Sequence, residues 1–135
     1  MSDIEHIGIA VEDLKKAAEI FSDILGYEPA GMESVPDQKV EVVFFASDEN
    51  PESGRIELLS STDPESPVGK FLDKRGPGLH HLALKVNDIE ARLAELKSKD
   101  YRLIDEKPRL GAGGKKVAFI HPLSTGGILI ELVER

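Results

Sequence analysis

Hydrophobic and polar positions follow one pattern twice along this chain. Residues 4–11 alternate between branched apolar side chains and small or polar ones, which predicts a strand. Residues 13–25 then place apolar side chains at helical spacing, and Gly26 marks the predicted end of that helix. The same succession returns as a strand over 80–86 and a helix over 88–97. Each half of the chain therefore opens with a strand and an amphipathic helix.

Shorter apolar stretches between turn residues predict the other strands. They are expected at 40–46 and 55–59, with room for a short one near Gly31, and then near 101–105 and at 116–120 and 128–133. A linker over 61–77, containing a short helix near 68–74, separates the two sets. The sequence thus predicts two tandem βαβββ modules, at about 1–60 and 78–135.

The length of the chain argues that both modules belong to one domain. The chain has 135 residues, and a module of roughly 60–70 residues would be marginal alone because small domains bury too little surface. We expect an α+β fold in which the modules form an open, barrel-like mixed sheet with the helices outside. The sheet face away from the helices would then line a trough.

Two histidines and two glutamates repeat along with the strands. His6 matches His81, 75 positions further on, and Glu57 matches Glu131, 74 positions further on. Each of these side chains points opposite to its immediate apolar neighbours, so all four are expected to face the trough. A lone histidine or glutamate in a strand is usually structural or exposed, but packing gives no reason to repeat Glu inside two apolar strands. The four residues are therefore predicted to bind one divalent metal ion per chain.

The other two histidines have simpler explanations. His80 adjoins His81, so only one of the two can face the trough, and the register of the repeat selects His81. His121 precedes Pro122 after a predicted strand. A turn contact and a place near the substrate are both open for His121.

Composition narrows the choice of metal and partner. The chain has no cysteine, so any metal ligands are nitrogen and oxygen atoms, which suit Co²⁺, Mn²⁺, Ni²⁺, Zn²⁺ or Fe²⁺. Four protein ligands around a six-coordinate ion would leave two adjacent positions for substrate, as catalysis requires. The net charge of −8 disfavours nucleic acid as a partner, and no apolar run reaches the roughly 18 residues of a membrane helix. We expect a cytoplasmic protein.

A glycine-rich segment lies between two predicted strands of the second half. Residues 111–115 read Gly-Ala-Gly-Gly-Lys and lack the spacing of a nucleotide-binding P-loop. The segment is predicted to be a flexible loop at one end of the trough. Backbone amides of Gly113 and Gly114 are the candidates there for binding a carbonyl or carboxylate of the substrate.

With these residues in place, the chain resembles the vicinal oxygen chelate superfamily and, more closely, its methylmalonyl-CoA epimerases. The resemblance extends over nearly all of the chain. The stretches that carry it are His6-Ile-Gly-Ile-Ala-Val, Asp63-Pro-Glu-Ser-Pro-Val-Gly-Lys-Phe-Leu, Gly78-Leu-His-His-Leu-Ala, Gly111-Ala-Gly-Gly-Lys-Lys-Val-Ala-Phe-Ile-His-Pro and Gly126-Gly-Ile-Leu-Ile-Glu-Leu.

The resemblance implies an enzyme of propionate metabolism that interconverts (R)- and (S)-methylmalonyl-CoA, an acyl-CoA substrate. It also implies a metal ion, with Co²⁺ as the first choice, bound by His6, His81 and Glu131. Glu57 stands at a fourth ligand position that is glutamine in some members. The relatives of the fold further imply a homodimer.

The acid/base groups follow less directly from the sequence. Removal of a thioester α-hydrogen requires a base and a stabilised enolate, and inversion requires proton transfer at both faces of that enolate. Glu131 is one predicted catalytic group. Some epimerases have a second carboxylate where this chain has Val42, and Glu41 has the opposite strand parity. The second group is therefore open among Glu57, Glu41 and a water molecule.

Two alternative functions share this fold. One is a glyoxalase-like metal-dependent lyase, which would have the same ligands and different substrate-binding walls. The other is a metal-free protein that binds small molecules, for which the repeated ligand pairs would be a coincidence.

Overall fold

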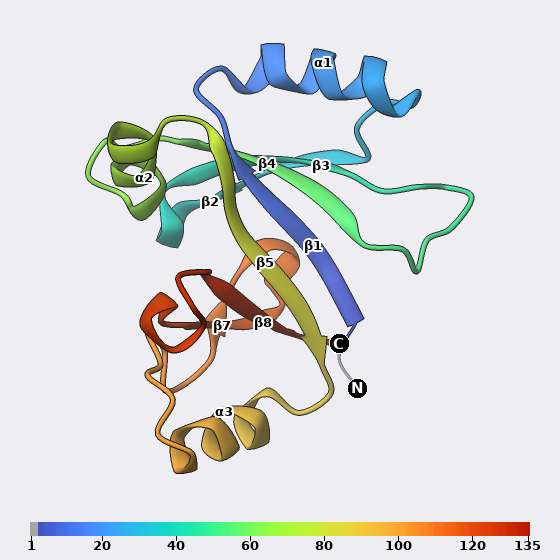
Figure 1. The fold of residues 1–135 in the computed structure, drawn as a ribbon. Coiled ribbons are helices and arrows are strands. Elements are labelled where there is room, and N and C mark those ends of the chain that lie inside the picture. The colour runs from blue at the N-terminus through green and yellow to red at the C-terminus, as the bar shows by residue number, and fades with distance from the viewer. Residues whose placement is uncertain (1–2) are drawn as a thin grey trace. The chain divides into compact units, whose positions relative to one another are not determined.

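A computed structural model describes residues 3–135 of the chain (Figure 1). Its helices and strands, in chain order, are β1 (Asp3–Ala10), α1 (Leu14–Leu25), β2 (Gly31–Val35), β3 (Val40–Phe45), β4 (Arg55–Ser61), α2 (Pro67–Arg75), β5 (Gly78–Val86), α3 (Ile89–Ser98), β6 (Arg109–Leu110), β7 (Lys116–Ile120) and β8 (Ile130–Glu134). Short 3₁₀ turns span Pro36–Gln38, Ala112–Gly114 and Pro122–Ser124. The order β-α-β-β-β occurs on both sides of α2, which confirms the predicted α+β architecture.

One predicted strand is wrong. The segment near 101–105 contains only an isolated bridge between Leu103 and Ile120, and the third strand from the end is the short β6 instead. The Asp105 side chain accepts a hydrogen bond from the Phe119 amide at 2.9 Å, an amide that a continuing strand would bind through a backbone carbonyl. The side chain therefore ends the pairing after a single bridge.

Both helices that follow the first strand of a module start at an aspartate. The Asp13 side chain accepts from the Lys16 amide at 3.0 Å at the start of α1, and the Asp88 side chain accepts from the Ala91 amide at 3.1 Å at the start of α3. Such caps satisfy amides that have no partner inside the helix. Helix α1 ends at Gly26, whose φ of 83° is a left-handed conformation that glycine adopts without strain. In both modules, the aspartate before the helix therefore marks where the helix begins.

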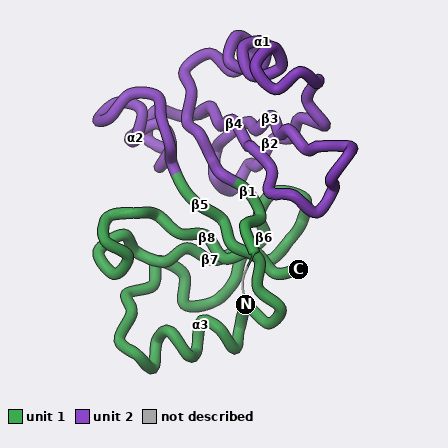
Figure 2. The backbone as a smooth tube through the Cα atoms, turned by 45° about the vertical axis from the view of Figure 1, so that its right-hand side comes forward, with its two compact units in different colours: residues 1–6, 81–135 green, residues 7–80 purple. Residues whose placement is uncertain are grey.

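The chain divides into two compact units (Figure 2). Among the described residues, unit 1 contains 3–6 and His81–Arg135, and unit 2 contains Ile7–His80. The strand order is β2-β3-β4-β1 in unit 2 and β5-β8-β7-β6 in unit 1, and both β1 and β5 run through the division. Strands β5 and β8 are parallel, whereas β2–β3, β3–β4, β6–β7 and β7–β8 are antiparallel. The pairing is therefore mixed, as predicted.

Helix α1 covers one face of the strands in unit 2. The buried side chains of that face are Val11, Val43, Phe45 and Leu58, and the apolar stripe of α1 packs against them. Ile9 and Ile56 lie on the same side. Residues that alternate with these, Glu57 among them, point to the other face of the strands.

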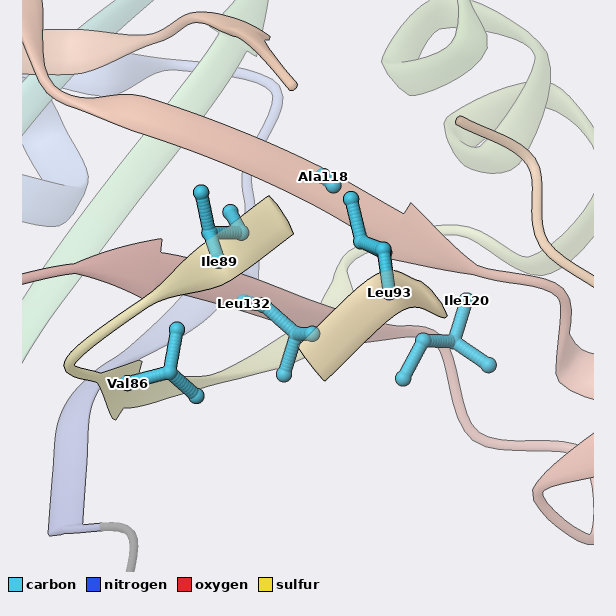
Figure 3. Packing of buried hydrophobic residues seen from close by; sticks show 6 residues of the cluster. All are labelled: Val86, Ile89, Leu93, Ala118, Ile120 and Leu132. Atoms are coloured by element: carbon cyan, nitrogen blue, oxygen red, sulfur yellow. The ribbon is translucent and has the colours of Figure 1, made fainter. Parts of the chain in front are cut away.

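Helix α3 covers one face of the strands in unit 1 in the same way (Figure 3). That core consists of Val86, Ile89, Leu93, Ala118, Ile120 and Leu132. A second buried group, Ala83, Val117 and Val133, occupies alternate positions and therefore the opposite face. His81 and Glu131 have the same parity as this second group, so they point away from α3, as the alternation predicted. Within residues 3–135 no helix is long and apolar enough to cross a membrane.

Candidate metal centre

Three predicted ligand side chains meet inside unit 1. Nε2 of His6 lies 2.9 Å from Nε2 of His81, and Oε1 of Glu131 lies 3.2 Å from the first nitrogen and 3.1 Å from the second. The three residues come from β1, β5 and β8. They are 5%, 8% and 5% exposed, respectively, so the cluster is almost closed to bulk solvent.

The pairing of β5 with β8 explains why His81 meets Glu131. The two strands are parallel, and Ala83 is the register partner of Glu131. His81 is two residues before Ala83 and therefore shares its face. Ala83 is fully buried and carries only a methyl group, so little side-chain bulk separates the imidazole from the carboxylate. The opposite neighbours, Leu84 and Leu132, belong to the core under α3.

A further carboxylate contacts the other ring nitrogen of His6. Oε1 of Glu5 lies 2.6 Å from Nδ1 of His6. When Glu5 is ionised it only accepts hydrogen bonds, and Nδ1–H of His6 is then the donor. In the neutral imidazole the other nitrogen, Nε2, then carries a lone pair, and this is the atom that faces His81 and Glu131.

The environment also keeps Glu131 ionised. Burial by itself would raise the pKa of this carboxyl, but when the His6 and His81 rings are protonated their hydrogen bonds and positive charge outweigh burial and lower the pKa to about 2. One anionic oxygen and two imidazole nitrogens thus converge on one point. Such a set of electron-pair donors is stable only around a cation, either a proton or a metal ion.

The spacing of the three atoms allows all of them to contact one metal ion. Ligand atoms at about 2.1 Å from an ion are about 3.0 Å apart when they subtend a right angle and about 3.4 Å apart in a tetrahedron. The observed separations of 2.9, 3.1 and 3.2 Å lie at or close to this range. Two histidines and one carboxylate would leave the rest of the coordination sphere of an ion to other ligands and substrate.

Glu5 was missed by the sequence analysis. It did not belong to the repeated pairs, yet both Glu5 and His6 are buried and their side chains are in contact. Lys115 provides a second partner, with Nζ at 3.6 Å from Oε2 of Glu5. The available signal was the position itself, because an acidic residue next to a candidate histidine ligand can bind the free ring nitrogen.

The fourth predicted ligand, Glu57, lies in unit 2. It is 3% exposed and sits on the face of β4 away from α1, opposite Phe44 of β3. Nη2 of Arg55 donates to its Oε2 at 3.1 Å. Glu57 is therefore a buried carboxylate on the predicted face, and its place in the coordination sphere stays a prediction.

The register of β3 decides between Val42 and Glu41. Strands β3 and β4 pair without a bulge from Val40 to Phe45. Val42 is buried and has the parity opposite to Val43, which packs under α1. Glu41 has the parity of Val43 and is exposed on the α1 side. Glu41 therefore lies on the opposite face of the sheet from Glu57. The register has no bulge that would turn the Glu41 side chain to the face of Glu57.

His80 and His121 have structural contacts. The His80 ring packs edge-on against Phe71 of α2, with ring centroids 5.0 Å apart. Nδ1 of His121 accepts from the Leu123 amide at 3.1 Å and so caps the turn Pro122–Ser124. Of the two possibilities for His121, the structure supports the turn contact.

The loop Gly111–Lys115 is a compact turn. Gly113 and Gly114 both have φ of 71°, a left-handed conformation that disfavours side chains. The Gly111 amide donates to the Lys115 carbonyl at 2.9 Å, and the Gly114 amide donates to the Gly111 carbonyl at 3.1 Å. The Gly114 amide is thus engaged within the loop, and substrate binding by Gly113 and Gly114 stays a prediction.

Another acidic group, Asp88, Glu90 and Glu134, lies at the start of α3. Its members have structural roles, because Asp88 caps the helix, Glu90 pairs with Lys116 at 3.1 Å and Glu134 accepts from the Ile89 amide at 3.1 Å. Carboxylates with such partners do not indicate a second metal site.

Comparison with known proteins identifies relatives of the whole chain. The family model described as the Glyoxalase/Bleomycin resistance protein/Dioxygenase superfamily matches residues 5–119. The mitochondrial methylmalonyl-CoA epimerase of Homo sapiens is 38% identical over 130 residues, which are 96% of this chain and 72% of the human protein.

Solved structures agree with these sequence relatives. The methylmalonyl-CoA epimerase of Mycobacterium tuberculosis has a TM-score of 0.90 at 40% identity and covers 97% of this chain and 86% of its own. A methylmalonyl-CoA epimerase in complex with methylmalonyl-CoA and NH₄⁺ has a TM-score of 0.90 at 33% identity, with 99% and 94% of the two chains covered. Similarity of this extent confirms the predicted glyoxalase-like fold.

Proposed function

The chain belongs to the glyoxalase/bleomycin resistance protein/dioxygenase superfamily, and we propose that it is a metal-dependent methylmalonyl-CoA epimerase. The observation that carries this proposal is the buried convergence of His6, His81 and Glu131, with separations of 2.9–3.2 Å between the three ligand atoms. The substrate comes from similarity, because relatives at 33–38% identity over nearly the whole chain are methylmalonyl-CoA epimerases.

The residues present fit a divalent ion. His6 and His81 provide two nitrogen ligands, Glu131 provides an oxygen ligand, and we propose Glu57 as the fourth. We propose Co²⁺ as the bound ion. Mn²⁺, Ni²⁺, Zn²⁺ and Fe²⁺ also bind such nitrogen and oxygen ligands. The ion would supply Lewis-acid stabilisation of the negative charge that develops on a substrate oxygen.

The protein side chains must then move the α-proton. Glu131 is one proposed acid/base group, although a pKa of about 2 makes its carboxylate a better ligand than base. The second group is Glu57 or a bound water molecule, since Glu41 lies on the α1 side of β3. A positioned base contributes about 10²–10⁴ in rate, so loss of the metal is expected to cost more than loss of either base alone.

Exchange of the α-hydrogen tests the proposal. Protein purified without added metal is loaded with Co²⁺ and incubated with (2S)-methylmalonyl-CoA in D₂O. We expect deuterium at the α-carbon and formation of the (2R) epimer, both abolished by a chelator. Metal-loaded protein that exchanges no hydrogen would reject the epimerase, and turnover of a hemithioacetal would indicate a lyase. Failure of the wild type to bind any divalent ion would indicate a metal-free binding protein.

A further inference from the structure

Glu5 is a buried carboxylate in contact with a predicted metal ligand. It is 5% exposed, with Oε1 at 2.6 Å from Nδ1 of His6 and Oε2 at 3.6 Å from Nζ of Lys115. We propose that Glu5 is a positioning residue of the metal centre, which fixes His6 in the tautomer that presents Nε2 to the ion. This inference rests on the proposed metal-dependent function.

The burial of Glu5 makes the contact specific. A buried ionised carboxylate is costly unless hydrogen bonds and opposite charge compensate for its lost hydration. Here one oxygen accepts from the His6 ring and the other faces the Lys115 ammonium group. Both carboxylate oxygens thus have positively polarised neighbours, which holds the side chain in one orientation.

The orientation of Glu5 has a direct consequence for His6. A ring that donates Nδ1–H to a carboxylate cannot rotate freely, and its Nε2 lone pair becomes a stronger electron donor. Neutral imidazole otherwise distributes its proton between Nδ1 and Nε2, and the second form cannot bind a metal through Nε2. Glu5 therefore removes the non-binding form and fixes the direction of the lone pair.

Lys115 connects Glu5 to the glycine loop. It is the last residue of the loop Gly111–Lys115, and its carbonyl accepts from the Gly111 amide at 2.9 Å. The Lys115 side chain is about half exposed, so solvent screens its attraction to Glu5 and the contribution of the ion pair is modest. We expect Lys115 to have only a small effect on the orientation of Glu5, whereas Glu5 itself determines the orientation of the His6 ring.

Cobalt titration of the full chain tests the proposal. Apo protein is titrated with Co²⁺ in competition with a chelator, and the visible absorption of bound cobalt is recorded for Glu5→Gln, Glu5→Ala, Glu5→Asp and Lys115→Met. We expect the Gln and Ala variants to bind Co²⁺ about 10–100-fold more weakly, with an altered spectrum. The Asp variant keeps a carboxylate and is expected to lose less affinity for Co²⁺ than the Gln and Ala variants. Lys115→Met is expected to change affinity by less than about fivefold.

A matched control separates a positioning role from a general effect of charge. Glu106 is an exposed glutamate of unit 1 that pairs with Lys97 at 2.9 Å, and Glu106→Gln should leave affinity and spectrum unchanged. Thermal unfolding of the apo variants shows whether each one folds, and Glu5→Gln keeps the shape of the side chain if Glu5→Ala does not fold. Wild-type affinity and spectrum in Glu5→Gln would overturn the inference. Wild-type protein that binds no cobalt would instead overturn the proposed function.

Discussion

Nε2 of His6 lies 2.9 Å from Nε2 of His81, although the two residues are 75 positions apart in the chain. Two ring nitrogens this close require a proton or a metal ion between them, because two lone pairs that face each other repel. The carboxylate of Glu131 faces both nitrogens, at 3.2 and 3.1 Å, which concentrates negative charge at the same point. A metal ion bound by the three groups would supply the cation at this point.

His81 and His80 provide the sharpest pair of variants. We expect His81→Ala to lose bound metal and epimerase activity, because it removes a nitrogen ligand from the buried cluster. We expect His80→Ala to keep one ion per chain and lose only about 1 kcal/mol of stability from its ring contact with Phe71. Elemental analysis of the two purified variants decides, and the reverse pattern would contradict the assignment of ligands.

The ionisation of Glu131 makes the stability of the apo protein depend on pH. Its pKa is lowered from 4.5 to about 2 in the folded chain, so its ionisation stabilises the fold above pH 4.5 and this contribution is lost as pH falls toward 2. The full contribution is of order 3 kcal/mol. We expect Glu131→Gln to flatten the pH dependence of the free energy of unfolding in this range, measured by urea denaturation without metal.

The exposed Glu106 serves as a control for that experiment. Its carboxylate pairs with Lys97 on the surface, where solvent screens the interaction. Glu106→Gln should therefore leave the pH dependence close to that of the wild type. An equal flattening in both variants would show that Glu131 is not specially stabilised.

Glu57 is expected to tolerate glutamine better than alanine. Gln keeps an oxygen ligand and a donor–acceptor group next to Arg55, whereas Ala removes the ligand atom and leaves a cavity at a buried position. We expect Glu57→Gln to retain one ion per chain with reduced affinity and Glu57→Ala to bind metal more weakly still. Isothermal titration with Co²⁺ measures both. Wild-type affinity in Glu57→Ala would remove Glu57 from the ligand set.

Alanine substitutions in the loop Gly111–Lys115 test whether this loop binds substrate. Gly113→Ala and Gly114→Ala place a side chain at φ of 71°, which should cost about 1–2 kcal/mol each and lower the thermal midpoint. If the loop binds substrate, KM for methylmalonyl-CoA should also rise, while cobalt affinity stays unchanged. Ala112→Gly alters the same loop without imposing that strain and serves as the control. Unchanged KM in both glycine variants would contradict substrate binding by this loop.

The sequence by itself determined most of the helices and strands and the faces of the strands. Alternation placed His81 and Glu131 away from the apolar neighbours that pack under α3, and the repeat selected His81 over His80. Aspartates before the two module helices and Gly26 after the first marked where helices begin and end. These properties are readable because each depends on residues only a few positions apart, through strand parity, helical spacing and local capping.

Only the tertiary structure decided the contacts between side chains that are distant in the sequence. The Asp105 side chain accepts a hydrogen bond from the Phe119 amide, which ends the pairing where a longer strand was predicted. The unbroken register of β3 keeps Glu41 on the α1 side. Strand parity did not select Glu5, because parity describes where a Cβ atom points and says nothing of how far a flexible carboxylate reaches. The distances of 2.9–3.2 Å among His6, His81 and Glu131 depend on the pairing of strands far apart in the chain, which no local pattern contains.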